Sequence, residues 1–278
     1  MIANALELMV PILLAALGGL LTERAGVLNI GLEGLILAGA FAGIAGANAF
    51  DSQLAGLLVG AAAGGLLAGV YSVACIDLRA NIFVAGLATN LLAAGLMPYV
   101  SALIYDTKGV VRLAGEPGFA SIAGVSIMVP VALLLAGLVT LALFETPFGI
   151  RLRAVGGTPG ALSARALDPN RYRRAAMLLS GVFAGVAGAE MSLRLGVYLP
   201  NISAGRGWIA LVAIFLGARH PLGVVGAAAV FAFFESFAGA AQGFTELPGT
   251  LLLGLPYLIT LVAMVLYSAL GRRRGPDA

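Results

Sequence analysis

Polar side chains recur in segments of this chain that are otherwise apolar enough to lie in hydrocarbon. Asn29 and Glu33 are one helical turn apart in GVLNIGLEGLILAGAFAG, and Glu235 lies in FAFFESFAG. An unpaired charge is costly in hydrocarbon, so such residues face protein or a wet cavity. Their chemistry is therefore hydrogen bonding, or binding of a proton or cation along a solute path. Two further amides share this setting: Asn90 and Asn201.

Residue sets that would support catalysis are missing from the sequence. There is no GxxxxGK[ST] nucleotide-binding loop, and the nearest candidate, GGTPG, has no following lysine. His220 lies in the turn ARHP without a second metal ligand at helical spacing. Cys75, the single cysteine, excludes a disulfide within the chain and a cysteine metal cluster. We expect no catalytic residue, no metal site and no cofactor in this chain, and no enzyme activity of its own.

The composition places the chain in a membrane. Of its 278 residues, 60% are hydrophobic and 10% are charged, and the mean hydropathy is +1.02. A soluble domain with this balance would have a largely apolar surface. The 39 glycines suit closely packed helices, as the spacing of Gly56, Gly60 and Gly64 allows. We therefore expect one all-α polytopic membrane domain over residues 1–278, with a retained first span.

Apolar runs long enough to cross about 30 Å of hydrocarbon define the expected spans. A shorter run at 208–218 lies between two tight turns, and it brings the count to nine if it crosses. The eight long runs fall near 4–21, 26–48, 53–75, 81–104, 126–145, 175–195, 222–243 and 249–270.

The distribution of basic residues orients these spans. Placing the loop 146–174 in the cytoplasm puts twelve of the 16 basic residues in cytoplasmic segments or at their ends. The four on the other side are Lys108, Arg112, Arg194 and Arg206. Because cytoplasmic loops are enriched in Lys and Arg, the sequence predicts an extracytoplasmic N-terminus and a cytoplasmic C-terminus.

Two segments resemble each other but enter the membrane from opposite sides. Leu28-Asn29-Ile30 precedes a glycine and an apolar run, and Pro200-Asn201-Ile202 does the same. Opposed repeats are typical of transporters whose solute path lies between the repeats. This pattern predicts an inverted repeat in which Asn29 and Asn201 are cavity or broken-helix residues.

The cytoplasmic loop 146–174 contains a predicted short helix. Thr158 can cap it, Pro159 suits its first position, and Asp168-Pro169 ends it near Leu167. Composition leaves open whether this helix touches anionic lipid or docks onto a soluble partner.

Three motifs together resemble the permease subunits of ABC importers for nucleosides and simple sugars. They are GVLNIGLEGLILAGAF, PFGIRLRAVGGTP and PNISAGRGWIALVAIFLGARHPLG, and the similarity extends from about Leu20 to Leu266. The resemblance implies a type II importer fold, a second permease subunit, two cytoplasmic ATPase subunits and an extracytoplasmic substrate-binding protein. ATP and Mg²⁺ would then bind to the ATPase subunits, and no nucleic acid is implied.

The same resemblance assigns roles to residues. The loop helix matches the helix that couples the permease to the ATPase, and Glu33 is expected to order the entrance of its helix. For Glu235 a place on the pathway and a bond between helices remain equal alternatives, whereas Glu190 can pair with Arg194 at helical spacing. The pathway and entrance set is Asn29, Glu33, Asn90, Asn201 and Glu235, and the coupling set is Thr158, Pro159, Ala161, Leu162, Arg165 and Ala166.

Alternative functions follow from the same features. A branched-chain amino-acid permease would share the entrance motif, and a self-sufficient secondary carrier would use Glu33 or Glu235 to bind a coupling ion. A membrane-embedded assembly protein is the third alternative, and solute uptake would exclude it. We expect the bacterial inner membrane as the location.

Overall fold

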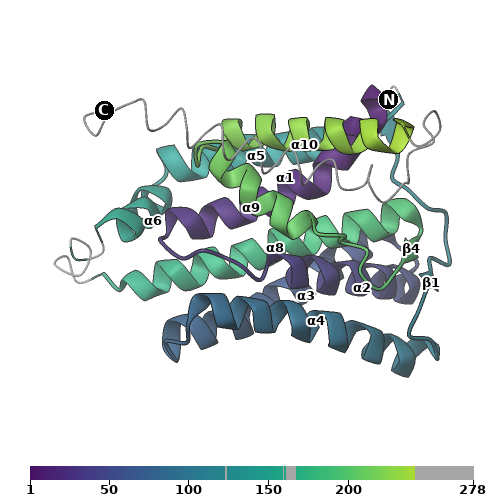
Figure 1. The fold of residues 1–278 in the computed structure, drawn as a ribbon, viewed down its shortest axis with the longest axis horizontal. Helices are drawn as coiled ribbons and strands as arrows, with labels where there is room; N and C mark the ends of the chain where they lie inside the picture. The colour runs from purple at the N-terminus through teal and green to yellow at the C-terminus, as the bar shows by residue number, and fades with distance from the viewer. Residues whose placement is uncertain (123, 159, 161–166, 242–278) are drawn as a thin grey trace.

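The computed structural model describes residues 1–122, 124–158, 160 and 167–241, and these residues are almost entirely helical (Figure 1). The helices are α1 (Ile2–Arg24), α2 (Leu32–Phe50), α3 (Gln53–Ser72) with a π-helical extension (Val73–Asp77), α4 (Ile82–Tyr105), α5 (Met128–Glu145), α6 (Pro147–Gly157), α8 (Pro169–Leu195), α9 (Arg206–Leu216) and α10 (Pro221–Ala241). Four two-residue strands are β1 (Val111–Arg112), β2 (Ser121–Ile122), β3 (Val125–Ser126) and β4 (Val197–Tyr198).

The chain runs back and forth between two ends of the bundle. At the basic end, which includes Arg24, Asp77, Arg174 and Arg219, the Arg24 Nε–H donates to the Arg219 carbonyl at 2.9 Å, and Arg174 pairs with Asp77 at 2.8 Å. At the opposite end, the strand end, β1 pairs with β4. Asn4, near the start of α1, also donates there to Ser236, near the end of α10. Apart from the short α6, successive helices therefore alternate in direction.

Seven helices of the described part are long and apolar enough to cross a membrane. They are α1, α2, α3 with its extension, α4, α5, α8 and α10. They correspond to seven of the predicted long spans, and the predicted span 249–270 lies outside the described residues. The chain is thus a multi-pass membrane protein.

The short run at 208–218 becomes a half-length helix. With eleven residues, α9 rises about 16 Å, roughly half of the hydrocarbon thickness. Tyr198 lies at the strand end and Arg219 at the basic end. The chain therefore passes from one end to the other through the irregular segment 199–205 followed by α9.

The described residues of the predicted cytoplasmic loop 146–174 are largely helical. Thr146 caps α6 by accepting the Gly149 N–H, and Pro147 occupies the first helical position. Asp168 caps α8 in the same way and Pro169 follows it. The helix α8 contains the span predicted at 175–195 and begins six residues before it, because the capping pair Asp168-Pro169 starts this long helix.

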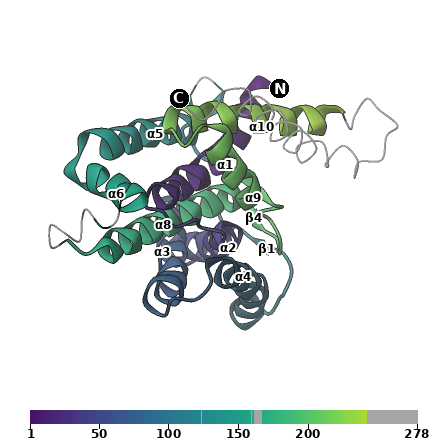
Figure 2. The same ribbon diagram turned by 60° about the vertical axis from the view of Figure 1, so that its left-hand side comes forward.

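Glycines bring α2, α3 and α8 together at the centre of the bundle. A Cβ at Gly60 would lie 2.6 Å from Ala189 Cβ, and one at Gly56 would lie 2.6 Å from the Gly43 carbonyl. Gly39 approaches the backbone of Gly185 as closely. Small residues allow membrane helices to gain dispersion energy by close contact. Figure 2 shows α1 and α8 between the α5–α10 side and the α2–α4 side.

Candidate translocation site

The irregular segment 25–31, which precedes α2, is anchored through Asn29. This side chain is fully buried. Its Oδ1 accepts the Gly31 N–H at 3.0 Å, and its Nδ2 donates to Ser180 Oγ of α8 at 2.8 Å. Buried irregular backbone is tolerated at membrane depth only where side chains satisfy its polar groups. Asn29 does this for the Gly31 N–H, which would otherwise lack an acceptor inside the bundle.

Asn90 of α4 completes the support of the same segment. Its Oδ1 accepts the Gly34 N–H at 2.8 Å, and its Nδ2 donates to the Ile30 carbonyl at 3.0 Å. The Tyr71 hydroxyl of α3 lies 3.5 Å from the Leu28 carbonyl. Side chains from three helices therefore hold segment 25–31, and Asn90 belongs to the entrance of α2.

Glu33 links this entrance to the start of α9. One carboxylate oxygen accepts the Ser203 hydroxyl at 2.5 Å and the Gly205 N–H at 2.8 Å. The other accepts the Gly207 N–H at 2.8 Å. Glu33 also lies in the first turn of α2. The carboxylate thus sits at two helix N-termini, where backbone dipoles and free N–H groups favour a negative charge. This geometry explains a carboxylate in an apolar segment.

The second irregular segment, 199–205, contains three residues with left-handed backbone, and Asn201 is one of them. The φ angles are 71° at Asn201, 45° at Ala204 and 83° at Gly205. Asparagine and glycine tolerate this conformation, whereas alanine is strained in it. Asn201 is exposed and lies before α9, as Asn29 lies before α2.

An ion-pair cluster joins four helices toward the strand end. Arg194 pairs with Glu190 at 3.2 Å, as the sequence spacing predicts, and with Glu7 of α1 at 3.9 Å. Arg206, at the start of α9, pairs with Glu235 of α10. Glu235 thus takes part in a bond between helices. Its predicted neighbour Gln242 lies outside the described residues.

The two irregular segments lead into helices that run in opposite directions. From their meeting point at Glu33, α2 runs to the strand end and α9 runs to the basic end. Opposed broken helices whose N-termini meet inside the bundle are typical of inverted-repeat transporters. The geometry therefore points to a membrane transporter.

Comparison with known sequences decides the family. Residues 1–266 match the family described as branched-chain amino acid transport system / permease component. The chain belongs to this permease family. It is 33% identical to the guanosine ABC transporter permease protein NupQ of Bacillus subtilis, over 96% of this chain and 91% of the relative.

Other relatives and one solved structure agree with this assignment. The permease is 32% identical to the nucleoside ABC transporter permease protein NupC of Lactococcus lactis, over 100% of this chain and 94% of that one. It is 31% identical to a putative glucose ABC transporter permease protein, TsgC13, of Haloferax volcanii, over 81% and 72% of the two chains. An inward-facing structure of a putative metal-chelate type ABC transporter shares the fold, with a TM-score of 0.51, 14% identity, and coverage of 95% and 85%.

The permease is therefore a subunit of an ABC importer, as the sequence motifs predict.

Of the predicted coupling residues, Thr158 is the C-cap of α6 and is exposed. The others lie outside the described residues: Pro159, Ala161, Leu162, Arg165 and Ala166. Within the described ranges, no three His, Cys, Asp or Glu side chains are grouped to hold a metal ion.

Several partners of the candidate site were not predicted. Ser180, Ser203 and Tyr71 contact the entrance segments from distant helices, and no short-range sequence pattern reports such contacts. The glycines of SAGRGW were the available signal, because closely spaced glycines before an apolar run indicate a tight backbone approach.

Proposed function

We propose that the permease forms half of an ATP-driven import path for a nucleoside. The observation that carries this proposal is the near full-length similarity to two permeases named for guanosine and nucleoside transport. A second permease subunit, two cytoplasmic ATPase subunits and an extracytoplasmic binding protein complete the importer. ATP and Mg²⁺ bind to the ATPase subunits, because this sequence has no nucleotide-binding loop.

The polar residues support a conduit rather than a tight solute site. The Glu33 carboxylate accepts three hydrogen bonds from the protein, and Asn29 and Asn90 are each bonded through both ends of the amide. These groups therefore shape the pathway by holding the two entrances, and selectivity rests with the binding protein.

Reconstitution tests this function. The permease, its sister permease, the ATPase and the binding protein are combined in proteoliposomes, and uptake of labelled guanosine is compared with uptake of glucose and leucine. We expect uptake of guanosine that requires ATP and all subunits. Uptake by the isolated chain without ATP would identify a secondary carrier, and preferred uptake of leucine would identify an amino-acid permease.

The N-terminus is proposed to be outside and the basic end cytoplasmic. The enrichment of arginine at one end of the bundle supports this orientation. In a Cys75→Ser background, a cysteine at exposed Gly115 should react with a membrane-impermeant maleimide added to intact cells, and one at exposed Gly157 should not. The reverse labelling pattern would contradict the orientation.

Coupling to the ATPase is assigned to the loop after Thr158. Replacing Leu162 by Asp should leave membrane insertion and pairing with the sister permease intact while abolishing stimulated ATP hydrolysis, because a charge would enter an apolar contact. A cross-link from a cysteine at Ala161 to the ATPase reports the contact directly. Full transport by the Asp variant, with no such cross-link, would remove this assignment.

A further inference from the structure

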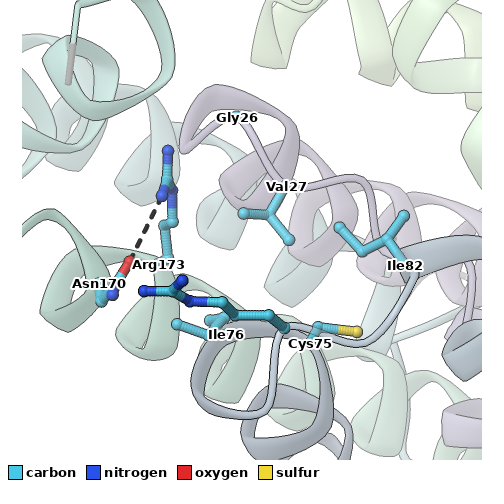
Figure 3. Close-up of a pocket in the computed structure, with 8 residues that line it drawn as sticks. Gly26, Val27, Cys75, Ile76, Ile82, Asn170 and Arg173 are labelled. Atoms are coloured by element: carbon cyan, nitrogen blue, oxygen red, sulfur yellow. Dashed lines mark hydrogen bonds between the residues drawn. The ribbon is translucent and has the colours of Figure 1, made fainter.

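A cavity of about 430 Å³ opens at the basic end between segment 25–31, the π-helical extension of α3, the start of α4 and the start of α8. Figure 3 shows Asn170 and Arg173 of α8 on one side and Val27, Ile82 and Cys75 across from them. Arg79, in the turn between α3 and α4, also lines the cavity. The cavity therefore combines two guanidinium groups and an amide with apolar side chains, and one of its walls is the start of segment 25–31, at Gly26 and Val27.

The positive charge of this cavity is not neutralised within the described part of the chain. No ion pair there involves Arg79 or Arg173. Of the acidic residues close in sequence, Asp77 pairs with Arg174 at 2.8 Å, and Asp168 caps α8 by accepting the Asn170 N–H at 2.9 Å. The buried Nε–H of Arg173 has no acceptor among the described residues, although one of its terminal N–H groups donates to Asn170 Oδ1 at 3.4 Å. A buried donor without an acceptor is costly, so an anionic ligand would relieve it.

Exposed apolar side chains adjoin, in the sequence, the lining residues Arg79 and Ile82. Leu78 is 75% exposed, and Phe83 and Val84, in the first turn of α4, are 60% and 66% exposed. Side chains of this kind beside arginines suit the boundary between acyl chains and headgroups. A free anion would use the arginines but not this apolar rim, whereas a phospholipid would use both.

We propose that this cavity binds the phosphate of an anionic phospholipid. The guanidinium groups of Arg79 and Arg173 donate to the phosphate oxygens, since Arg forms strong, planar hydrogen bonds to phosphate. The acyl chains lie along Leu78, Phe83 and Val84. The site places a lipid beside the first turns of α8, directly after the loop assigned to the ATPase.

Lipid retention by the full-length permease, purified with its co-purifying subunits, tests the site. The protein is equilibrated in mixed micelles of dioleoylphosphatidylglycerol and dioleoylphosphatidylcholine, and bound lipid is counted by native mass spectrometry. We expect selective retention of phosphatidylglycerol. The double variant Arg79→Gln/Arg173→Gln should weaken this retention roughly tenfold or more, because two charge-assisted contacts are lost.

A matched variant controls for net charge. Arg151→Gln/Arg171→Gln removes two exposed arginines from the same end without touching the cavity, and it should retain phosphatidylglycerol like the wild type. Melting temperatures in phosphatidylcholine alone should agree for all three proteins. Unchanged retention by the cavity variant, or equal losses in both variants, would overturn the proposal.

Two further measurements distinguish the lipid from other possible occupants of the cavity. Displacement of phosphatidylglycerol from the wild type by inorganic phosphate would overturn the lipid assignment in favour of a free anion. Loss of the co-purifying ATPase from the cavity variant, with lipid retention intact, would overturn it in favour of a protein contact.

Discussion

The irregular segments 25–31 and 199–205 precede α2 and α9 in related ways but are held differently. The first forms hydrogen bonds with side chains of α3, α4 and α8, as acceptor toward Tyr71 and Asn90 and as donor toward Ser180. In the second, the Glu33 carboxylate accepts from Ser203 and Gly205, Arg206 of α9 donates to the Ser203 carbonyl at 3.4 Å, and three residues have left-handed backbone. The first entrance is therefore supported several times over, while the second depends on α2.

This asymmetry has a mechanical meaning. Since Glu33 belongs to α2 and accepts from the start of α9, a displacement of α2 carries the start of α9 with it. The position of α9 is thus set by the other repeat, and the comparison between the two segments can be tested by removing one support at a time.

Removing Glu33 should have the largest effect. In Glu33→Ala the N–H groups of Gly205 and Gly207 and the Ser203 hydroxyl lose their acceptor, at about 1–3 kcal/mol for each buried group. We expect a melting temperature too low for the permease to accumulate, and no uptake. Glu33→Gln keeps one acceptor oxygen and should lose less. An Ala variant with normal melting would show that segment 199–205 supports itself.

The second largest effect should come from adding a methyl group next to the second segment. The same addition at the first segment should cost much less stability. A Cβ at Gly207 would lie 2.5 Å from the Glu33 backbone nitrogen and 2.8 Å from its carboxylate, whereas one at Gly31 would meet no atom closer than 3.4 Å. Gly207→Ala should therefore destabilise the permease by about 1–3 kcal/mol, and Gly31→Ala by less than about 0.5 kcal/mol. Thermal unfolding in detergent measures both, and equal shifts would remove the predicted difference.

Deleting a single support of the first segment should have a moderate effect. Asn90→Ala leaves the Gly34 N–H and the Ile30 carbonyl unpaired, yet Asn29 and Tyr71 still hold the segment. We expect a loss of about 1–2 kcal/mol with transport retained. If Asn90→Ala were as damaging as Glu33→Ala in the same unfolding assay, the first segment would have no redundancy.

Relieving strain in the second segment should have the smallest effect and the opposite sign. Ala204 has φ of 45°, which glycine adopts without penalty. Ala204→Gly should raise the stability of the permease by up to about 1 kcal/mol. The control Ala40→Gly, in the buried interior of α2, should lower it, because glycine is unfavourable inside a helix. A drop in melting temperature for both would show that the left-handed turn stores no strain.

The sequence predicts those features that depend on local patterns. Apolar length locates the spans, and the i, i+4 spacing predicts the pair of Glu190 with Arg194. The setting of Asn29 and Glu33 in an apolar run indicates a helix entrance, because polar groups in hydrocarbon need partners. The pair Asp168-Pro169 predicts a helix boundary, and in the structure this boundary is the start of α8.

Contacts between distant helices could not be predicted in the same way. Glu33 meets Ser203 across 170 positions, and Arg206 meets Glu235 across 29. Apolar helices of similar composition can pack in many orders, so nothing in the segment around Glu33 specifies its acceptor role toward α9. The sequence therefore predicts that Glu33 needs partners without identifying them.

The glycine contacts among α2, α3 and α8 make these three helices one frame. Where backbones touch, as Gly39 touches Gly185 and Gly60 approaches Ala189, there is no layer of side chains whose rotamers can adjust while one helix slides over another. Changes of shape during a transport cycle must then fall on helices outside this frame, such as α5, where a Cβ at Gly137 would meet no atom within 4 Å. A pair of spin labels on α2 and α8 should keep a fixed separation through the cycle, and a pair on α2 and α5 should record the movement.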